Sequence, residues 1–184
     1  MEKWIDSKTC FSGKIFSVKT GLVVLEDGSE AQRDIVEHHG GVAVVPVIGD
    51  DVALIKQFRI SIGREIVEIP AGKLENGEVP EDCARRELEE ELGYRANDLI
   101  LAHSYYSSVG FTNEPMHIYL AVELNESKQK PDWDERIQIL KYPIREIENK
   151  LINNEFEDSK TIIGLYAMLR YLQKPDTSGK QAIK

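Results

Sequence analysis

The alternation of apolar and polar residues predicts that this chain begins with strands and not with helices. Residues 16–25 alternate as a half-buried strand does, and the Glu-Asp-Gly-Ser that follows is a turn sequence. We therefore interpret residues 14–38 as an antiparallel meander. Residues 41–59 then predict a buried strand, a Gly-Asp-Asp turn and a second strand. Alternation returns in residues 64–74 until it breaks at Pro70.

Residues 80–92 are the first segment with the features of a helix. Pro80 suits the first turn, where its missing N–H costs nothing. Glu81 and Asp82 complement the positive end of the helix dipole, and Gly93 stands where a C-cap is expected. The remaining elements are strands at residues 99–108, 116–124 and 136–144, and helices at residues 144–154 and 159–173. Strands outnumber helices, and helices interrupt them late, so we predict an α/β sandwich with a mixed sheet.

The composition indicates one globular domain with room for a small appendage. Of the 184 residues, 41% are hydrophobic and 30% are charged, which is enough to bury a sizeable core. The net charge of −9 argues against binding to the phosphate backbone of nucleic acids. A negative protein that acts on a negative substrate needs cations to mediate the contact.

The cysteines and the apolar runs favour a cytoplasmic protein. Cys10 and Cys83 lack the spacing of a metal site or a disulfide framework, which fits a reducing cytosol. We expect Cys83 to be packed and neither thiol to be catalytic. The N-terminus has no apolar signal-peptide core, and no apolar stretch approaches the roughly 18 residues of a membrane span. We therefore expect no signal peptide and no membrane partner.

Three carboxylates crowd one face of the predicted helix at residues 80–92. Glu87, Glu90 and Glu91 fall within about 100° of one another on a helical wheel. Their repulsion costs a few tenths of a kcal/mol per pair, and a hard divalent cation such as Mg²⁺ would offset that cost. Arg86 is placed to pair with Glu90 and hold its orientation. The alternative is a solvated acidic face, which is common on surface helices.

The spacing of these residues resembles the Nudix box, G-x5-E-x7-R-E-U-x-E-E-x-G-U, in which U is a bulky apolar residue. The matching positions are Gly72, Glu78, Arg86, Glu87, Leu88, Glu90, Glu91, Gly93 and Tyr94. Seven fixed identities at ordinary residue frequencies match by chance on the order of 10⁻⁸ times per start position. The resemblance implies an enzyme that hydrolyses a nucleoside diphosphate linked to another moiety with the help of a divalent metal.

The resemblance also implies roles for the box residues. Glu87, Glu90 and Glu91 would ligate Mg²⁺, with Mn²⁺ as a possible substitute, and the Ala71 carbonyl would be a further ligand. Glu91 and Arg86 would belong to the catalytic machinery. Glu78 would fix the loop–helix–loop or stand in an outer metal shell, and the two box glycines would serve backbone geometry.

Segments outside the box resemble the ADP-ribose pyrophosphatase and nucleoside-diphosphate-sugar hydrolase branch. They are "IVEHHGGVAVVPV", "LIKQFR" and "REIVEIPAGKLENGE", and the resemblance covers about residues 14–172. The branch implies an N-terminal antiparallel sheet, here residues 1–40, that exchanges across a homodimer. It precedes a Nudix domain of α/β/α type, here residues 41–174, and residues 175–184 would be a frayed tail.

ADP-ribose is the leading substrate that the branch implies, giving AMP and ribose 5-phosphate. ADP-ribose-preferring members usually carry Pro sixteen residues beyond the last box glycine, where this chain has Val109. That departure keeps GDP-mannose and other nucleotide sugars open. Two other classes also stay open: a nucleotide-sensing Nudix domain without activity, and a hydrolase of nucleoside triphosphates or RNA caps. Retention of every box carboxylate favours an enzyme over the sensing domain.

Four residues outside the box match positions near the substrate in this branch: Arg59, Arg64, Glu65 and Glu114. Arginine can grip a diphosphate with paired donors, and a carboxylate can accept from sugar hydroxyls. The alternatives are ion pairs at a strand edge and, for Glu114, a loop cap. His38, His39, His103 and His117 show no ligand spacing, and we expect them to be structural.

The general base is expected in the acidic segment "PDWDERIQI". In the branch it lies on a mobile loop before a late strand, where closure can exclude water. Glu135 directly precedes the strand and is the first candidate, with Asp134 and Asp132 as alternatives. An ordinary solvated connector would have the same composition.

Overall fold

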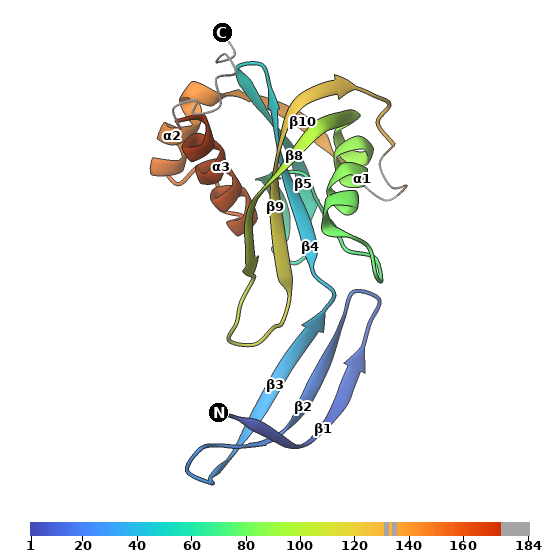
Figure 1. Cartoon of the computed structure of the whole chain (residues 1–184), viewed down its shortest axis with the longest axis vertical. Coiled ribbons are helices and arrows are strands. Elements are labelled where there is room, and N and C mark those ends of the chain that lie inside the picture. Colours follow the sequence, from blue (N-terminus) through green and yellow to red (C-terminus); the bar gives the residue numbers. More distant parts are fainter. Residues whose placement is uncertain (131–132, 134–135, 174–184) are drawn as a thin grey trace.

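The N-terminal residues form a small sheet of their own. The computed structural model describes residues 1–130, 133 and 136–173. Strands β1 (Lys3–Ser12), β2 (Phe16–Val24) and β3 (Glu30–His38) pair antiparallel in that order and extend away from the rest of the chain (Figure 1). The apolar alternation predicted the meander but no strand at β1, whose residues are all exposed; the antiparallel sheet that the resemblance implied for residues 1–40 does include them.

The main sheet has the mixed topology that the sequence predicted. Its strands are β4 (Gly41–Ile48), β5 (Asp51–Arg59), β6 (Arg64–Glu68), β7 (Ala71–Lys73), β8 (Tyr94–Tyr106), β9 (Pro115–Glu126) and β10 (Gln138–Pro143). The order is β10-β5-β4-β9-β8, with β6 beside β5 and β7 beside β4. The β4–β9 pair is parallel and the others are antiparallel.

Helices cover both faces of this sheet. Helix α1 (Pro80–Leu92) lies on one face, and α2 (Ile144–Ile152) and α3 (Ser159–Leu172) lie on the other (Figure 1). The α1 boundaries agree with the sequence prediction. Its C-cap is Gly93 at a φ of 70°, a left-handed conformation that glycine adopts without strain.

Strand β4 supplies the apolar core on both sides of the sheet. Val42 and Val44 pack in the cluster that includes Leu88 of α1. Ala43 and Val45 belong to the opposite cluster, which includes residues of α2 and α3. This division follows from the two-residue period of a strand, which sends alternate side chains to opposite faces.

The loop between β8 and β9 joins the small sheet to the main domain. Within the range 107–114, the Phe111 carbonyl accepts from Val36 N at 2.8 Å and Asn113 N donates to the Val36 carbonyl at 3.3 Å. Asn113 Oδ1 accepts from His38 N at 2.9 Å. The end of β3 is therefore held against the tip of the β8–β9 hairpin.

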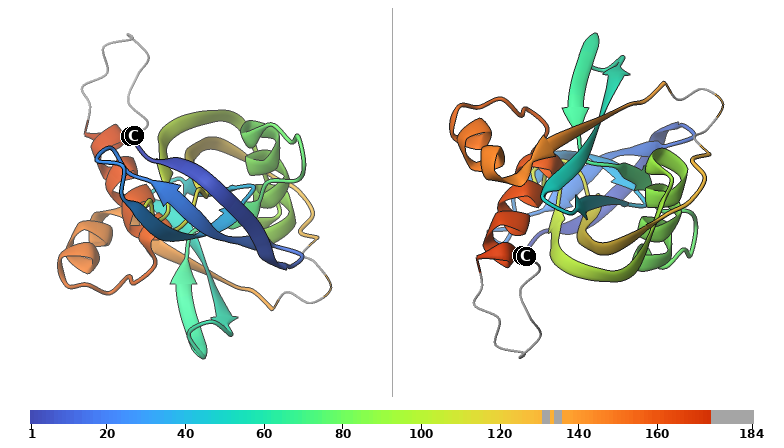
Figure 2. Two further views of the ribbon diagram at one scale, coloured as in Figure 1. Left: turned by 90° about the horizontal axis from the view of Figure 1, so that it is seen from below. Right: turned by 90° about the horizontal axis from the view of Figure 1, so that it is seen from above.

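The β5–β6 hairpin projects sideways from the domain body, as the views along the long axis show (Figure 2). Ile60 at its tip is 87% exposed. In the described part of the chain, no helix combines the length and the apolar character that crossing a membrane requires.

Candidate active site

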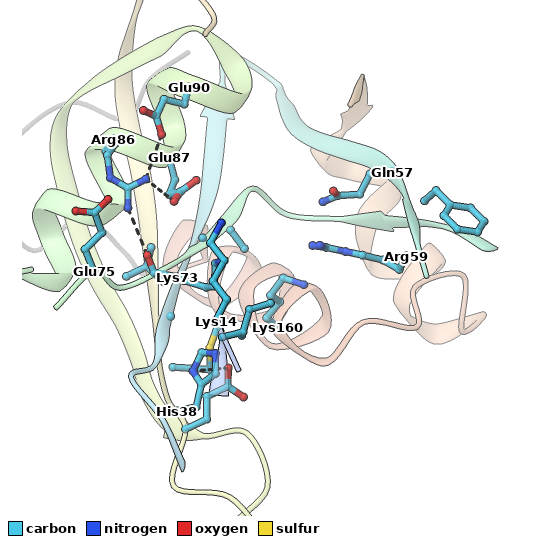
Figure 3. Close-up of a pocket in the computed structure, with 18 of the residues that line it drawn as sticks. Lys14, His38, Gln57, Arg59, Lys73, Glu75, Arg86, Glu87, Glu90 and Lys160 are labelled. Atoms are coloured by element: carbon cyan, nitrogen blue, oxygen red, sulfur yellow. Dashed lines mark hydrogen bonds and ion pairs between the residues drawn. The ribbon is translucent and has the colours of Figure 1, made fainter. Parts of the chain in front are cut away.

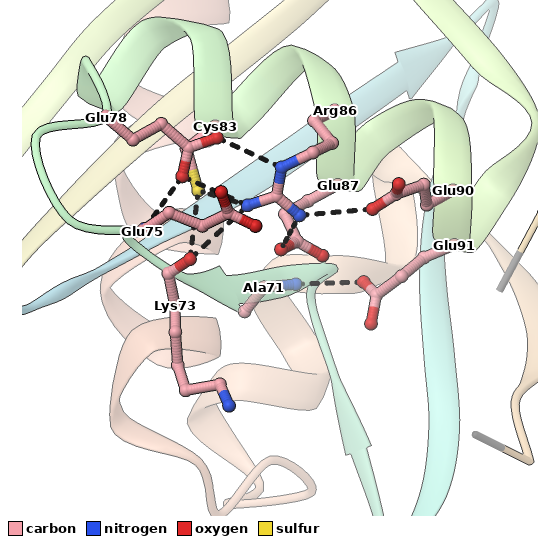
Figure 4. Close-up of polar contacts among 9 residues, drawn as sticks. All are labelled: Ala71, Lys73, Glu75, Glu78, Cys83, Arg86, Glu87, Glu90 and Glu91. Atoms are coloured by element: carbon pink, nitrogen blue, oxygen red, sulfur yellow. Dashed lines mark hydrogen bonds and ion pairs between the residues drawn. The ribbon is translucent and has the colours of Figure 1, made fainter. Parts of the chain in front are cut away.

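Glu78 ties the loop before α1 to the helix itself (Figure 4). Its carboxylate accepts from Glu75 N at 2.9 Å and from Nε and Nη2 of Arg86 at 3.0 and 3.1 Å. These hydrogen bonds, those from Arg86 first, lower the pKa of Glu78 from 4.5 to about 2. Glu78 therefore stays ionised at neutral pH and fixes the loop–helix junction.

Arg86 binds two further carboxylates through Nη1. The distances are 2.6 Å to Glu87 Oε1 and 3.1 Å to Glu90 Oε2, and the predicted pairing with Glu90 is confirmed. The hydrogen bond to Glu78, with the charge of Glu87, raises the pKa of Arg86. One guanidinium thus offsets the repulsion among three acidic side chains.

Two box carboxylates lie directly against the backbone of residues 71–72. Ala71 N donates to Glu91 Oε2 at 3.0 Å, and Glu91 is 1% exposed. A Cβ atom at Gly72 would overlap the carboxylate of Glu87. Only glycine lets this acidic group approach the loop so closely, which explains the residue at the start of the box.

The donors in this corner fit a hard divalent cation, which prefers carboxylate and carbonyl oxygens. Ala71, Glu87 and Glu90 line a common cavity, and Glu91 lies buried behind them. Within the described residues, no three acidic, His or Cys side chains are already gathered around one point. Glu87 and Glu90 are turned toward Arg86 (Figure 4).

Cys83 on the same helix is buried, as predicted. Its Sγ lies 3.4 Å from the carbonyl of Lys73, to which it donates. Burial raises the pKa of this thiol to about 12. A thiol with so high a pKa is a poor nucleophile, so Cys83 contributes packing.

A cavity of about 1040 Å³ opens beside the box carboxylates. Its walls come from the small sheet through Lys14 and His38, from β5 through Gln57 and Arg59, and from α3 through Lys160 (Figure 3). The cavity is large enough for a dinucleotide-sized ligand. Acidic side chains line one part of it and cations line another.

The predicted substrate residues divide into two groups. Arg59 and Glu114 line the cavity. Glu65 pairs with Lys56 at 2.6 Å, and Arg64 pairs with Glu157 at 2.5 Å; both pairs are exposed and lie outside the cavity lining.

Of the remaining predicted positions, one lies outside the cavity lining and three are not among the described residues. Val109, where the resemblance led us to look for a sign of substrate preference, is 82% exposed and does not line the cavity. Glu135, Asp134 and Asp132 lie outside the described residues.

His38 lines the cavity, although no histidine was expected there from the sequence. Its Nδ1 accepts from Gly40 N at 2.9 Å, which shapes the link between β3 and β4. The same atom lies 3.4 Å from Glu114 Oε1. No local sequence signal marks this contact, because Glu114 is far away along the chain.

Glu68 was also missed, and it is one of the most buried charged residues described, at 2% exposure. It accepts from Arg59 Nε at 2.7 Å and Nη2 at 3.0 Å, and it pairs with Lys160. A charged residue between Val67 and Ile69 was the available signal, since buried carboxylates are rare unless they are paired.

A sequence profile of the NUDIX domain matches residues 37–163. The chain belongs to the Nudix family. The predicted resemblance is confirmed, and the chain is a Nudix hydrolase.

Two relatives match almost the whole chain. An ADP-ribose pyrophosphatase of Bacillus subtilis (strain 168) is 42% identical over 175 residues, which are 94% of this chain and 92% of that protein. A methanol dehydrogenase activator of Bacillus methanolicus is 35% identical over 175 residues, with the same two coverages.

A solved structure supports the Nudix fold, including the N-terminal sheet. The crystal structure of an ADP compounds hydrolase superposes with a TM-score of 0.84 and covers 94% of each chain at 20% identity.

Replacing Gly72 by Ala should weaken metal binding much more than it weakens the fold. The added Cβ displaces the end of the Glu87 side chain, which can swing away at low cost. We expect the Mn²⁺ dissociation constant to rise about 10- to 100-fold in calorimetric titration. The free energy of unfolding should change by less than about 1 kcal/mol.

The matched control is Gly110→Ala, because a Cβ there would meet nothing within 4 Å. It should leave both the Mn²⁺ affinity and the stability unchanged. Wild-type Mn²⁺ affinity in Gly72→Ala would contradict the prediction that Glu87 ligates the metal.

Replacing Glu78 by Gln should flatten the acid limb of the stability curve. A carboxyl whose pKa is lowered on folding stabilises the protein at any pH above the pKa that the group has in the unfolded chain. This stabilisation disappears as the pH falls to the pKa that the group has in the folded protein. For Glu78 the window runs from 4.5 down to about 2. Urea denaturation across that range should show a steeper fall for the wild type than for Glu78→Gln, and parallel curves would refute the pKa assignment.

Proposed function

We propose that this Nudix hydrolase cleaves the diphosphate bond of nucleoside-diphosphate sugars with Mg²⁺, or Mn²⁺ in its place. ADP-ribose is the first substrate, and GDP-mannose is a further candidate. The observation that carries the proposal is the set of box oxygen donors at the wall of a cavity that also contains Arg59. The 42% identity to an ADP-ribose pyrophosphatase supports the choice of substrate.

The metal corner would consist of Glu87, Glu90, Glu91 and the Ala71 carbonyl. A bound Mg²⁺ would neutralise phosphate oxygens and lower the pKa of a coordinated water. Glu87 and Glu90 would exchange part of their contact with Arg86 for the metal.

Arg59 would bind the diphosphate opposite the metal corner. Its Nε and Nη2 are occupied by Glu68, and within the described residues Nη1 makes no hydrogen bond. That nitrogen can donate to a phosphate oxygen. Glu114, beside His38, would accept from hydroxyls of the terminal sugar.

We further propose Glu135 as the general base that accepts a proton from the attacking water. Trp133 and Arg136, the described residues on either side of it in the sequence, both line the cavity. The short separation in sequence therefore supports a place for this carboxylate near the same cavity.

We propose a cytoplasmic location, because a reducing cytoplasm suits both free cysteines.

A regulatory role is the second candidate, and one observation favours it. The relative from Bacillus methanolicus is named for activating another enzyme. In such a role, a nucleotide would bind in the cavity, and the nucleotide-bound protein would regulate a partner protein. Binding of ADP-ribose without turnover would select this candidate.

Hydrolysis of ADP-ribose in ¹⁸O-labelled water with Mg²⁺ tests the enzymatic proposal. We expect AMP and ribose 5-phosphate, with one ¹⁸O in one of the two products. Glu91→Gln should reduce kcat by about two to three orders of magnitude, because it removes a ligand of the metal that stabilises charge on the phosphate oxygens.

Glu89→Gln is the control on the same helix, because Glu89 pairs with Arg95 and Ser127 away from the cavity. It should retain activity. Absence of a nucleoside monophosphate from ADP-ribose and GDP-mannose alike, or full activity in Glu91→Gln, would refute the proposal.

We also propose that the chain is a homodimer joined through the N-terminal sheet. Every residue of β1 is exposed, and Ile5 and Phe11 are each 50% exposed. A sheet without a covering layer needs a packing partner, and a second copy supplies one of matched shape.

Analytical ultracentrifugation of the wild type should therefore give twice the mass of one chain. Ile5→Asp should shift the equilibrium toward the monomer, because it puts a charge into the apolar contact. The control Ile152→Asp alters an isoleucine on α2 that is 64% exposed, and it should remain dimeric. A wild type that sediments as a monomer at micromolar concentration would rule out the dimer.

A further inference from the structure

Four charged residues gather around the buried carboxylate of Glu68 beside the cavity, where β6 meets the start of α3. Glu68 accepts a paired hydrogen bond from Arg59 on one side and binds Lys160 on the other. Lys160 Nζ also lies 2.9 Å from Asp158 Oδ1. Lys160 thus bridges two carboxylates, and its own side chain is only 14% exposed.

Glu68 remains ionised in this group. Burial acts to raise its pKa, but the hydrogen bonds from Arg59 and the charge of Lys160 outweigh burial, and the pKa lies below its ordinary value. A buried carboxylate of this kind requires both cations, because loss of one partner leaves an uncompensated charge.

The N-terminus of α3 holds the neighbouring backbone as well. Asp158 Oδ2 caps the helix by accepting from Thr161 N at 2.9 Å and Thr161 Oγ1 at 2.6 Å. The same Oγ1 accepts from Ile69 N at 2.9 Å. The side chain of Glu68 and the backbone of Ile69 are therefore both fixed from α3.

This anchoring determines how Arg59 faces the cavity. Arg59 lies at the end of β5 on the projecting hairpin, and its side chain is 40% exposed. An arginine at such a position loses much rotamer entropy when it must hold one geometry. Glu68 binds two of its nitrogens in advance, which orders the guanidinium at the cavity wall before any ligand binds.

We propose that Lys160 is a positioning residue that locks Glu68 against Asp158 and thereby fixes the guanidinium of Arg59 for the substrate diphosphate. The role rests on the proposed hydrolysis of nucleotide sugars. It differs from direct contact of Lys160 with a phosphate, which its place in the cavity lining would also allow.

A double-mutant cycle separates positioning from direct contact. The four proteins are the wild type, Lys160→Met, Arg59→Met and the double variant, each assayed with ADP-ribose and Mg²⁺. If Lys160 acts through Arg59, Lys160→Met should raise KM about 10-fold in the wild type, as loss of one charged hydrogen bond does. In the Arg59→Met background it should raise KM less than about 2-fold. Equal effects in both backgrounds would overturn the proposal.

A spectroscopic measurement tests the same claim without turnover. The Arg59 Nε–H signal in a ¹H–¹⁵N spectrum, assigned by its loss in Arg59→Met, should be resolved and exchange slowly with water in the wild type. Lys160→Met should broaden it or speed its exchange at least about 10-fold, because the orienting hydrogen bond is weakened. An unchanged signal would refute positioning, whatever the substrate proves to be.

Lys150→Met is the control for loss of a paired lysine, because Lys150 binds Glu155 at 2.8 Å and does not line the cavity. It should change neither KM nor the Arg59 signal. If Lys160→Met does not fold, Lys160→Gln replaces it, since the amide keeps a donor for Glu68 without the charge. The same two outcomes then decide the proposal.

Discussion

One guanidinium holds the acidic corner of this protein together. Arg86 contacts Glu78 in the loop before α1 and Glu87 and Glu90 on the helix, and without it these three negative charges would face one another unpaired. The same contacts set the conformation of the loop before α1, since Glu78 also binds the backbone of Glu75. The same contacts of Arg86 therefore both neutralise charge and fix the loop, and a divalent cation that bound here would meet carboxylates whose repulsion is already offset.

The backbone of residues 68–71 is held by hydrogen bonds from both faces of the sheet. Thr161 of α3 binds the amide of Ile69, while Glu91 of α1 binds the amide of Ala71. Between them, the carbonyl of Pro70 accepts from Val44 N at 2.8 Å. Helices on opposite faces of the sheet thus both hydrogen-bond the same short backbone segment. This fixes the box carboxylates and the Arg59–Glu68 pair relative to each other.

Local signals were sufficient to predict α1 and the box, because Pro80, Gly93 and the carboxylate spacing lie within one stretch of sequence. The surroundings of the cavity depend on register and on distant partners. Ile55 pairs with Glu68 across the β5–β6 hairpin, which puts Glu68 and Arg59 on one face and Glu65 on the other. That register depends on where the turn between β5 and β6 begins and ends, and the sequence alone does not define these limits. The Lys160 contact to Glu68 spans 92 residues, and no local pattern announces it.

The parallel pairing of β4 with β9 has a consequence for how the chain is made. Helix α1 packs in a cluster that includes Tyr119 and Ala121 of β9, yet it leaves the ribosome before β9 exists. Strands β4 and β5 can cover part of its apolar stripe at once, but the part that packs on β9 stays exposed until synthesis passes Glu126, because non-local strand pairing requires the complete partner. The many charged residues on this helix thus also protect the nascent chain from aggregation until β9 has been synthesised.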